Sequence, residues 1–380
     1  MVSNQQKVLI SCSAAKSLLK FRGKLIEELL KTSIVYVFTP EIQDPNLRVT
    51  LQQMGIIIYE NQLKRNNISI SSDIEYIISL SKVVREVKPD VFFAYTFKPL
   101  IFGSIVASLF NVKTKVAMLT GLGYNFADSD KSFSKSITQT LLKFSLRFNK
   151  DLKIVFQNED DLHELMKRNI LGKSSKTFVV NGSGVDLNFY TYSKPNIKPL
   201  RFLLIARLIK AKGVEEFFAA AKIIHQKYPA LKFSVVGSFD DKQIDSINPG
   251  LYQEIINSEF IDFTGWVEDV RPYIEQSSVV VLPSYREGTP RSILEGMSMG
   301  RAIITTDTAG CRQTVNTDPE MTNGHLIKVK SVSDIVNSME HFILNPEDVI
   351  KFGVNGRTFA EQKYDVDKVN KEMLKILFPS

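Results

Sequence analysis

Cysteine is scarce in this sequence, which limits the kinds of site that the chain can build. Only Cys12 and Cys311 are present among 380 residues. They lie far apart and match no zinc-ligand spacing, so no metal site is expected from them. Both stand among small residues, and we therefore expect buried free thiols and a cytoplasmic protein.

Long apolar runs are missing as well. No segment approaches 18 consecutive apolar residues, so the sequence predicts no membrane-spanning helix. The first residues, Met-Val-Ser-Asn-Gln-Gln-Lys, lack an apolar signal core and lead directly into a predicted strand. We expect a cytoplasmic chain whose membrane contact, if it has one, is peripheral on the inner face of the cytoplasmic membrane.

Acidic residues are outnumbered by basic ones. The chain has 48 Lys and Arg against 41 Asp and Glu, a formal net charge of +7 with a pI of about 9.1. Such an excess suits nucleotide phosphates, lipid phosphates or nucleic acid, although a solvated basic surface without a partner has the same composition. Nucleic-acid binding would be supported by exposed aromatics between the cations, which we do not expect here, so we predict no nucleic-acid partner.

Predicted strands alternate with predicted helices along the chain, which is typical of an α/β protein with parallel sheets. The length and the 44% hydrophobic content fit two domains with separate cores. Two prolines among polar residues at 193–199 predict a linker. We expect residues 1–190 and 200–363 to form two doubly wound, Rossmann-like domains that face a central crevice.

The helices expected from apolar spacing share a 3.6-residue period. They cover 21–30, 73–87, 99–110, 133–148, 159–169, 214–225, 270–276, 332–344 and 366–377, with one more after Pro290.

Glu287 and Glu295 lie eight residues apart around a predicted strand-to-helix loop. The apolar stretch 279–283 predicts a buried strand, Gly288 marks a turn, and Pro290 suits the first turn of a helix. Loops of this kind face the ligand crevice at the carboxyl ends of parallel strands. The two carboxylates could bind sugar hydroxyls or stabilise a developing positive charge, and an acidic helix start without a ligand is the alternative.

A second loop, 206–213, carries Arg207 and Lys212 between a predicted strand and helix. Gly213 opens that helix, whose N-terminal amides favour an anion. A guanidinium and an ammonium beside such an end can form a diphosphate site, whereas two solvated surface cations are the alternative. The loop lacks the spacing of a nucleoside triphosphatase phosphate loop, and no dinucleotide fingerprint follows any predicted strand.

Three further predicted strand ends would open on the same crevice. They are Gly237 with its following residues, the loop around Trp266, and 306–311. The backbone next to Trp266 could flank a base, and burial of this tryptophan in the core is equally compatible with the sequence.

The segment 131–153 combines an apolar stripe with basic residues at helical spacing. It could lie on an anionic membrane, or its stripe could pack on the sheet while the cations stay solvated. The stripe consists of Phe133, Ile137, Leu141, Phe144 and Phe148, and the cations are Lys135, Lys143, Arg147, Lys150 and Lys153.

These loops together resemble the family 4 retaining glycosyltransferases of GT-B fold. The match rests on Ala206-Arg-Leu with Lys212-Gly, on Val235-Val-Gly-Ser, Phe263-Thr-Gly-Trp and Thr306-Asp-Thr-Ala-Gly-Cys-Arg-Gln, and on the motif from Pro283 to Gly300. A narrower resemblance, to bacterial transferases that extend polyprenyl-diphosphate-linked oligosaccharides, rests on Thr96-Phe-Lys-Pro99, Thr120-Gly-Leu-Gly-Tyr124 and Cys311-Arg-Gln313. Such relatives also imply that a C-terminal helix within 364–380 packs back on the first domain.

The resemblance assigns roles to residues in both halves. It implies that Arg207 and Lys212 hold the donor diphosphate, that Glu287 lies by the donor sugar, and that Glu295 binds the ribose. Further donor contacts are implied for Gly288, Thr289, Pro290, Arg291, Gly237 and Trp266. Acceptor contacts are implied for Thr96, Lys98, Gly121, Gly123 and Tyr124.

One departure from the family concerns histidine. Many members carry a histidine at the site in the N-terminal half, but residues 1–162 contain none. Lys98 is expected to take over part of that role on an anionic acceptor. The N-terminal glycine-rich loop is also reduced, because 11–17 contains no glycine.

We therefore expect a retaining glycosyltransferase that moves a hexose or N-acetylhexosamine from a UDP-sugar to a polyprenyl-diphosphate-linked saccharide in surface-glycan, O-antigen or protein-glycan assembly. No cofactor or divalent metal is expected, because Arg207, Lys212 and helix amides can stabilise the leaving diphosphate. The alternatives are a UDP-sugar 2-epimerase of the same fold and a non-catalytic two-lobed ligand-binding protein.

Overall fold

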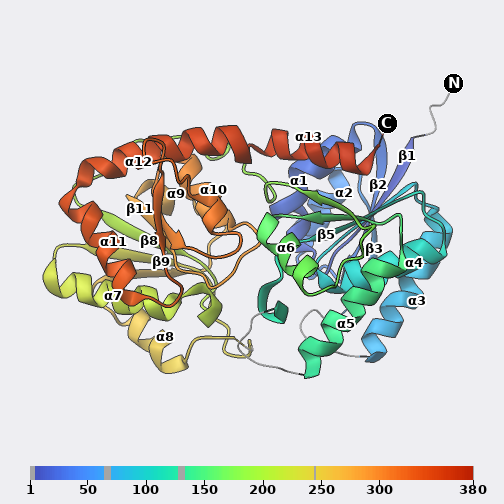
Figure 1. Cartoon of the computed structure of the whole chain (residues 1–380), viewed down its shortest axis with the longest axis horizontal. Coiled ribbons are helices and arrows are strands. Elements are labelled where there is room, and N and C mark those ends of the chain that lie inside the picture. Colours follow the sequence, from blue (N-terminus) through green and yellow to red (C-terminus); the bar gives the residue numbers. More distant parts are fainter. Residues whose placement is uncertain (1–4, 64–69, 127–132, 244, 380) are drawn as a thin grey trace. The chain divides into compact units, whose positions relative to one another are not determined.

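The structure is a computed structural model, and it describes residues 5–63, 70–126, 133–243 and 245–379. It divides into two compact units, one of Met1–Ser183 with Asp367–Ser380 and one of Gly184–Val366. Each unit contains an all-parallel sheet, of seven strands in the first and six in the second (Figure 1). The expected α/β class with two doubly wound sheets is thus confirmed.

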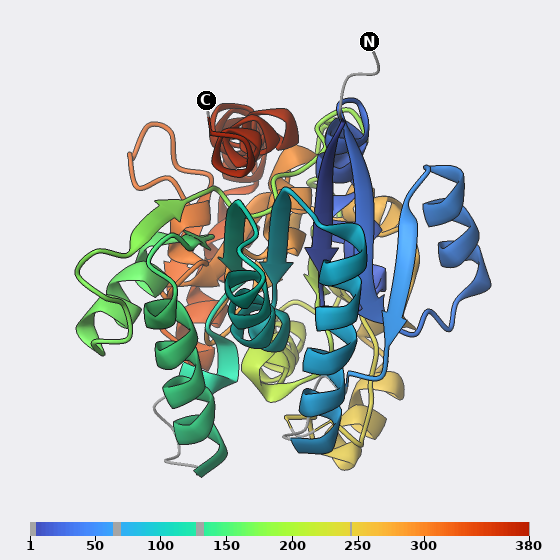
Figure 2. The same cartoon turned by 90° about the vertical axis from the view of Figure 1, so that its right-hand side faces the viewer.

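The first unit has the strand order β3-β2-β1-β4-β5-β6-β7. Helices cover both faces of this sheet, because Val8 and Ile10 of β1 belong to one core and Leu9 to another (Figure 2). The strands are β1 (Gln6–Ser11), β2 (Ser33–Pro40), β3 (Ile57–Asn61), β4 (Val91–Tyr95), β5 (Thr114–Leu119), β6 (Lys153–Phe156) and β7 (Lys176–Val179). The helices are α1 (Lys16–Leu30), α2 (Pro45–Gln53), α3 (Ile70–Val87), α4 (Ser104–Leu109), α5 (Phe133–Phe148), α6 (Glu159–Lys167) and α13 (Val366–Leu377), with π-helical η1 (Pro99–Gly103) and 3₁₀ η2 (Gly123–Phe126).

Apolar residues of α13 pack into the core of the first unit. Met373, Ile376 and Leu377 are buried there beside side chains of β1, β4 and β5. The Lys153 ammonium at the start of β6 donates to the carbonyl of Ile376 at 2.5 Å. The end of the chain therefore belongs structurally to the unit in which the chain begins.

The second unit has the strand order β10-β9-β8-β11-β12-β13, so the winding reverses between β8 and β11. Its strands are β8 (Arg201–Ile205), β9 (Lys232–Val236), β10 (Ile261–Gly265), β11 (Val279–Leu282), β12 (Ala302–Thr306) and β13 (Gly324–Ile327). Its helices are α7 (Val214–Lys227), α8 (Pro249–Ile256), α9 (Arg271–Glu275), α10 (Arg291–Ser298), α11 (Val332–Leu344) and α12 (Pro346–Phe359), with the 3₁₀ turns η3 (Lys210–Lys212) and η4 (Arg312–Thr314) and the π-helical η5 (Ala360–Tyr364).

Strand register in the second unit brings the carboxyl ends of neighbouring strands to one level. Ile205 of β8 lies opposite Val236 of β9, and Leu282 of β11 lies opposite Thr305 of β12. The loops that follow these strands therefore leave from the same edge of the sheet. This edge is where open α/β sheets bind ligands.

Three helices in the structure, α2, α8 and α12, were not expected from apolar spacing. All three begin at an Asx-Pro pair: Asp44-Pro45, Asn248-Pro249 and Asn345-Pro346. Asp44 and Asn248 accept hydrogen bonds from first-turn amides, and proline at the first helical position loses no hydrogen bond. Helices α2 and α8 are therefore set by their caps more than by an apolar face, whereas Asn345 makes no side-chain cap and α12 relies on its proline start.

Of the two alternatives for the apolar stripe of α5, packing on the sheet does not hold for its exposed members, although Ile137 is half-buried. Leu142 and Leu146 are the apolar residues that α5 buries, whereas Leu141, Phe144 and Phe148 are 37%, 55% and 48% exposed. The two faces of the helix are both apolar, so spacing alone could not say which one is covered. Residues 131–132 and the side chain of Phe133 lie outside the described part.

Both cysteines are buried free thiols, as the sequence predicted. Burial raises the pKa of Cys311 to about 12, so this thiol stays protonated at neutral pH.

Arg301 is a fully buried guanidinium that fixes the segment leading into β8. Its five N–H groups reach the carbonyls of Ile274, Glu275 and Met299 and both the carbonyl and hydroxyl of Ser193, at 2.6 to 3.0 Å. Burial lowers its pKa to about 10, so it remains charged at neutral pH. Its planar fork matches this set of oxygens, which three lysine donors could not.

We predict that Arg301→Met lowers the free energy of unfolding by about 3 kcal/mol, because it leaves buried carbonyl oxygens without donors. The free energy of unfolding of Arg301→Lys should lie between those of the wild type and Arg301→Met. Denaturant unfolding measures the effect, with Lys222→Met on the exposed face of α7 as the control. Equal stability of Arg301→Met and the control would contradict the role given to Arg301.

Candidate functional site

The residues expected to bind the donor lie along one edge of the second unit's sheet. Each follows the carboxyl end of a strand: Arg207 and Lys212 follow β8, Gly237 follows β9, and Trp266 follows β10. Glu287, Gly288, Thr289 and Pro290 follow β11 and lead into α10 with Arg291 and Glu295. The loop after β12 is 307–311.

Lys212 and Glu287 form a direct ion pair at this edge. The Lys212 ammonium donates to the Glu287 carboxylate, and their side chains are only 21% and 13% exposed. The two residues come from different loops, 75 positions apart in the sequence. In a partly buried pair of this kind each charged group is held in position by the other.

Two glycines allow the three central loops to touch. Gly213 adopts φ +69° and lies against the carbonyl of Pro283, so a β-carbon would clash with the backbone there. Gly310 adopts φ +75° and lies against the carbonyls of Glu287 and Gly288. The loop after β11 is therefore held between its two neighbours by backbone contact.

Hydrogen bonds fasten the same loop on both sides. On the β8 side, the Tyr285 amide donates to the Ala211 carbonyl at 2.9 Å. On the β12 side, the Thr308 hydroxyl donates to the Tyr285 carbonyl at 2.9 Å, and the Glu287 amide donates to the Ala309 carbonyl at 3.1 Å. The backbone at Glu287 is thus positioned before any ligand binds.

Glu295 is buried, 5% exposed, and its carboxylate has two partners. One oxygen accepts from the Tyr190 hydroxyl and from Nε of Arg291, each at 2.8 Å. Burial opposes the charged form of Arg291, but Glu295 outweighs burial and raises its pKa. Burial and then Glu295 also raise the pKa of Tyr190, which therefore stays a hydrogen-bond donor.

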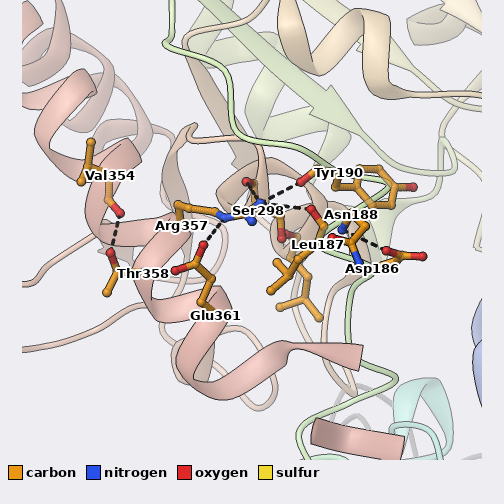
Figure 3. Close-up of polar contacts among 10 residues, drawn as sticks. Asp186, Leu187, Asn188, Tyr190, Ser298, Val354, Arg357, Thr358 and Glu361 are labelled. Carbon is orange, nitrogen blue, oxygen red and sulfur yellow. Dashed lines mark hydrogen bonds and ion pairs between the residues drawn. The ribbon is translucent and has the colours of Figure 1, made fainter. Parts of the chain in front are cut away.

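Tyr190 reaches Glu295 because its backbone is anchored by Arg357 of α12. The Arg357 guanidinium donates to the carbonyls of Tyr190 and Ser298 at 3.0 Å, and more weakly to that of Leu187 (Figure 3). Glu361 pairs with the Nε side of Arg357 at 2.6 Å. The segment before β8 is thereby attached to α10, which carries Glu295.

Arg207 and Trp266 are exposed at the ends of their strands. Arg207 has no side-chain hydrogen bond or ion pair to any residue in the described ranges, unlike Lys212. Trp266 is 64% exposed, which excludes its burial in the core. The Gly237 amide donates to the Gly265 carbonyl at 2.8 Å, and this bond joins the ends of β9 and β10.

The residues expected to contact the acceptor lie in the first unit, after the neighbouring strands β4 and β5. Thr96 adopts φ +70°, a strained conformation for a β-branched residue, and its hydroxyl bonds Ser13 at 2.9 Å. Strain of this kind is concentrated at functional sites. The Lys98 ammonium pairs with Asp73 of α3 at 2.7 Å, with both side chains about 15% exposed.

Gly121 and Gly123 follow β5 with φ +107° and +51°, and Gly123 is exposed. The backbone of Tyr124 belongs to η2, and its side chain lies outside the described part.

Tyr190 and Asp73 contact candidate residues and were not expected from the sequence. Neither belongs to a motif: Tyr190 is 105 positions from Glu295, and Asp73 is 25 positions from Lys98. A helix start with an acidic first turn was the only signal for Asp73, and it is common.

Chemically, the second unit presents a fixed carboxylate, a fixed ammonium and an exposed guanidinium along one sheet edge. Such a set can hold an anionic group beside hydroxyl groups. Glu295 already accepts hydrogen bonds from Tyr190 and Arg291. It can therefore serve in ligand binding, in holding α10, or in both.

These roles can be separated by measuring affinity for UDP, the nucleotide that the resemblance implies. If Glu295 binds ribose hydroxyls, Glu295→Gln should weaken UDP binding at least about tenfold, because the stronger acceptor is lost. Tyr190→Phe keeps the carboxylate and should change UDP affinity little while lowering stability by about 1 kcal/mol. Calorimetry that finds UDP affinity unchanged in Glu295→Gln would reject the ribose assignment.

Comparison with family models matches both halves of the chain. The model of the glycosyl transferases group 1 matches residues 199–345, and the glycosyl transferase 4-like model matches residues 23–158. The group 1 match contains Arg207, Lys212, Glu287 and Glu295, and the second match contains Thr96 and Lys98.

Curated relatives are similar over most of their length. The chain is 26% identical, over 96% of each chain, to the N,N'-diacetylbacillosaminyl-diphospho-undecaprenol alpha-1,3-N-acetylgalactosaminyltransferase of Campylobacter jejuni. It is 27% identical, over 72% of this chain and 71% of the relative, to the UDP-Gal:alpha-D-GlcNAc-diphosphoundecaprenol alpha-1,3-galactosyltransferase of Escherichia coli.

Solved structures share the fold. Anabaena HepE in complex with UDP and glucose aligns with a TM-score of 0.76 at 18% identity, over 98% of this chain and 99% of HepE. Sucrose-phosphate synthase from Thermosynechococcus elongatus aligns with a TM-score of 0.80 at 17% identity, over 98% of each chain. The expected GT-B fold is confirmed by these likenesses, and the chain is a glycosyltransferase with a glycosyl transferase 4-like domain followed by a glycosyl transferases group 1 domain.

Proposed function

We propose that this glycosyltransferase moves a hexose or N-acetylhexosamine from a UDP-sugar to a polyprenyl-diphosphate-linked saccharide during bacterial surface-glycan or protein-glycan assembly. The observation that carries the donor side is the contact between Lys212 and Glu287 at the carboxyl edge of the second unit. A cation for the leaving diphosphate and a carboxylate for the sugar lie side by side there.

The proposed chemistry follows from how charge moves when the anomeric bond breaks. Positive charge develops on the sugar and negative charge on the departing diphosphate. Lys212, the exposed Arg207 and the amides at the start of α7 are suited to stabilise the diphosphate, and Glu287 the sugar. We propose that these groups act without a divalent metal and that the anomeric configuration is retained through attack on the same face.

The identity of both substrates is supported by the relatives. The Escherichia coli relative is named for a UDP-galactose donor, and both curated relatives are named for diphosphoundecaprenol-linked acceptors. We propose the same substrate classes for this chain.

On the acceptor side, we propose that Thr96, Lys98 and the glycine loop with Gly121, Gly123 and Tyr124 contact the acceptor. The strained backbone of Thr96 and the partly buried ion pair of Lys98 support this role. Asp73 would keep the ammonium of Lys98 oriented until an anionic acceptor competes for it.

We further propose that α5 contacts an anionic membrane surface, where such an acceptor would reside. In the described ranges no helix could span a bilayer. The exposed rings of Phe144 and Phe148 stack at 5.5 Å, beside exposed Leu141. Lys143 precedes Phe144 and Lys150 follows Phe148 in the sequence, whereas the guanidinium of Arg147 bonds carbonyls at 169–171. Apolar residues next to cations favour an anionic interface.

The proposed reaction predicts transfer from one UDP-sugar of a panel to an undecaprenyl-diphosphate-linked saccharide, in the presence of a chelator, with the linkage read by NMR. Lys212→Gln should reduce donor use about 10²-fold or more, because a fixed cation at the leaving group is lost. Lys210→Gln, an exposed lysine of the same turn, is the control. No transfer with any donor, together with no UDP binding, would reject the proposal; epimerised donor would identify an epimerase.

The membrane proposal predicts that Phe144→Ser with Phe148→Ser reduces cosedimentation with phosphatidylglycerol-containing vesicles at least about fivefold, because two rings that insert into the membrane interface are lost. Ile223→Ser with Leu344→Ser removes two other exposed apolar side chains, in the second unit, and serves as the control. Equal vesicle binding by both double variants would contradict a specific role for α5.

A further inference from the structure

The second unit contains a pocket of about 530 Å³, whose lining includes Asp307 at the start of the loop after β12. Its wall includes the loop after β12, η4, the edge strand β13, the end of α12 and η5. The loop after β12 is the one whose Gly310 touches the backbone of Glu287. The pocket and the donor-side carboxylate therefore share one packed edge of one unit.

Two cations from separate elements line this pocket, Arg312 of η4 and Lys363 of η5. Arg312 is oriented by Asp307, whose carboxylate accepts from Nε at 2.8 Å and whose carbonyl accepts from Nη2 at 3.1 Å. The Lys363 ammonium donates to the Gln313 carbonyl at 3.2 Å and lies about 5 Å from two aromatic ring centres. Both cations are held in place, and with one carboxylate the lining has an excess of positive charge.

Apolar side chains form another part of the wall, beside the polar Gln313 and Thr317. Val315, Leu326 and Phe359 line the pocket together with the amide side chain of Asn316. Fixed cations and amide donors next to an apolar surface match a ligand with an oxyanion attached to an apolar chain. Arg312 and Gln313 belong to the Cys-Arg-Gln motif that no donor role had explained.

We propose that this pocket binds the phosphoryl oxygens of the acceptor's diphosphate, with the first part of the prenyl chain against Phe359 and Leu326. The inference rests on the proposed function, since it takes the lipid-linked acceptor as the substrate. It assigns part of acceptor binding to the second unit. Its two cations are separate from the Arg207 and Lys212 pair proposed for the donor.

The test is calorimetric titration of the full chain with geranyl diphosphate, with and without saturating UDP. The wild type should bind, and the double variant Arg312→Gln with Lys363→Gln should bind at least about tenfold more weakly. Lys363→Arg should keep most of the affinity that Lys363→Gln loses. Lys351→Gln, an exposed lysine on α12, should bind as the wild type does. No binding to the wild type, or equal binding by the double variant, would overturn the proposal.

Two further arms identify the source and the chemistry of the ligand. If the pocket holds the acceptor's diphosphate, UDP affinity is unchanged in the double variant while the KM for the lipid-linked acceptor rises; a loss of UDP affinity instead would overturn the acceptor assignment. Asp307→Asn should not weaken geranyl diphosphate binding, because it removes a negative charge. If Asp307→Asn weakened acceptor use and Lys363→Gln left it unchanged, the pocket would bind sugar hydroxyls and not a diphosphate. That result would overturn the proposal.

Failure of this inference can be told from failure of the proposed function. Transfer to the lipid-linked acceptor with an unchanged KM in the double variant would reject the pocket and keep the glycosyltransferase reaction. If transfer and UDP binding were absent while geranyl diphosphate still bound through Arg312 and Lys363, the glycosyltransferase reaction would be rejected and the oxyanion pocket kept.

Discussion

Backbone contact among three loops at the carboxyl edge of the second sheet is the constraint on which the candidate site depends. Gly213 and Gly310 let the loop after β11 lie against the loops after β8 and β12, where a β-carbon would clash. Because the amide of Glu287 is bonded to the β12 loop and its carboxylate to Lys212 of the β8 loop, the side chain cannot move independently of either. A site assembled in this way needs little reorganisation to receive a charged ligand.

Arginines that bind main-chain oxygens give the same unit its second support. Arg301 donates hydrogen bonds to oxygens of Ser193, of α9 and of the residue after α10. Arg357 donates to the carbonyls of Tyr190 and of Ser298 at the end of α10. Both guanidiniums thus tie the segment before β8 to the helix that carries Glu295. These contacts hold the C-terminal end of α10, and the loop at its N-terminal end lies at the ligand edge. Stability and site geometry therefore depend on the same contacts.

Much of the fold could be predicted, but some elements could not. Alternating strands and helices with consistent periods predicted two doubly wound sheets, since strands buried on both faces have continuous apolar runs. The three missed helices have weak apolar faces and are defined by Asx-Pro starts, a signal that would have found them. The buried face of α5 could not be chosen from the sequence, because Leu142 and Leu146 and the stripe of Leu141, Phe144 and Phe148 both have helical spacing.

The sequence by itself determined the family, the α/β class and the loops that carry Arg207, Lys212, Glu287 and Glu295, because motif spacing and strand-end position are local properties of the chain. Only the tertiary structure decided which side chains meet. The pairing of Lys212 with Glu287, of Glu295 with Tyr190 and of Lys98 with Asp73 joins residues 25 to 105 positions apart. Such contacts depend on strand order and register, which place distant loops at one edge and which no local pattern encodes.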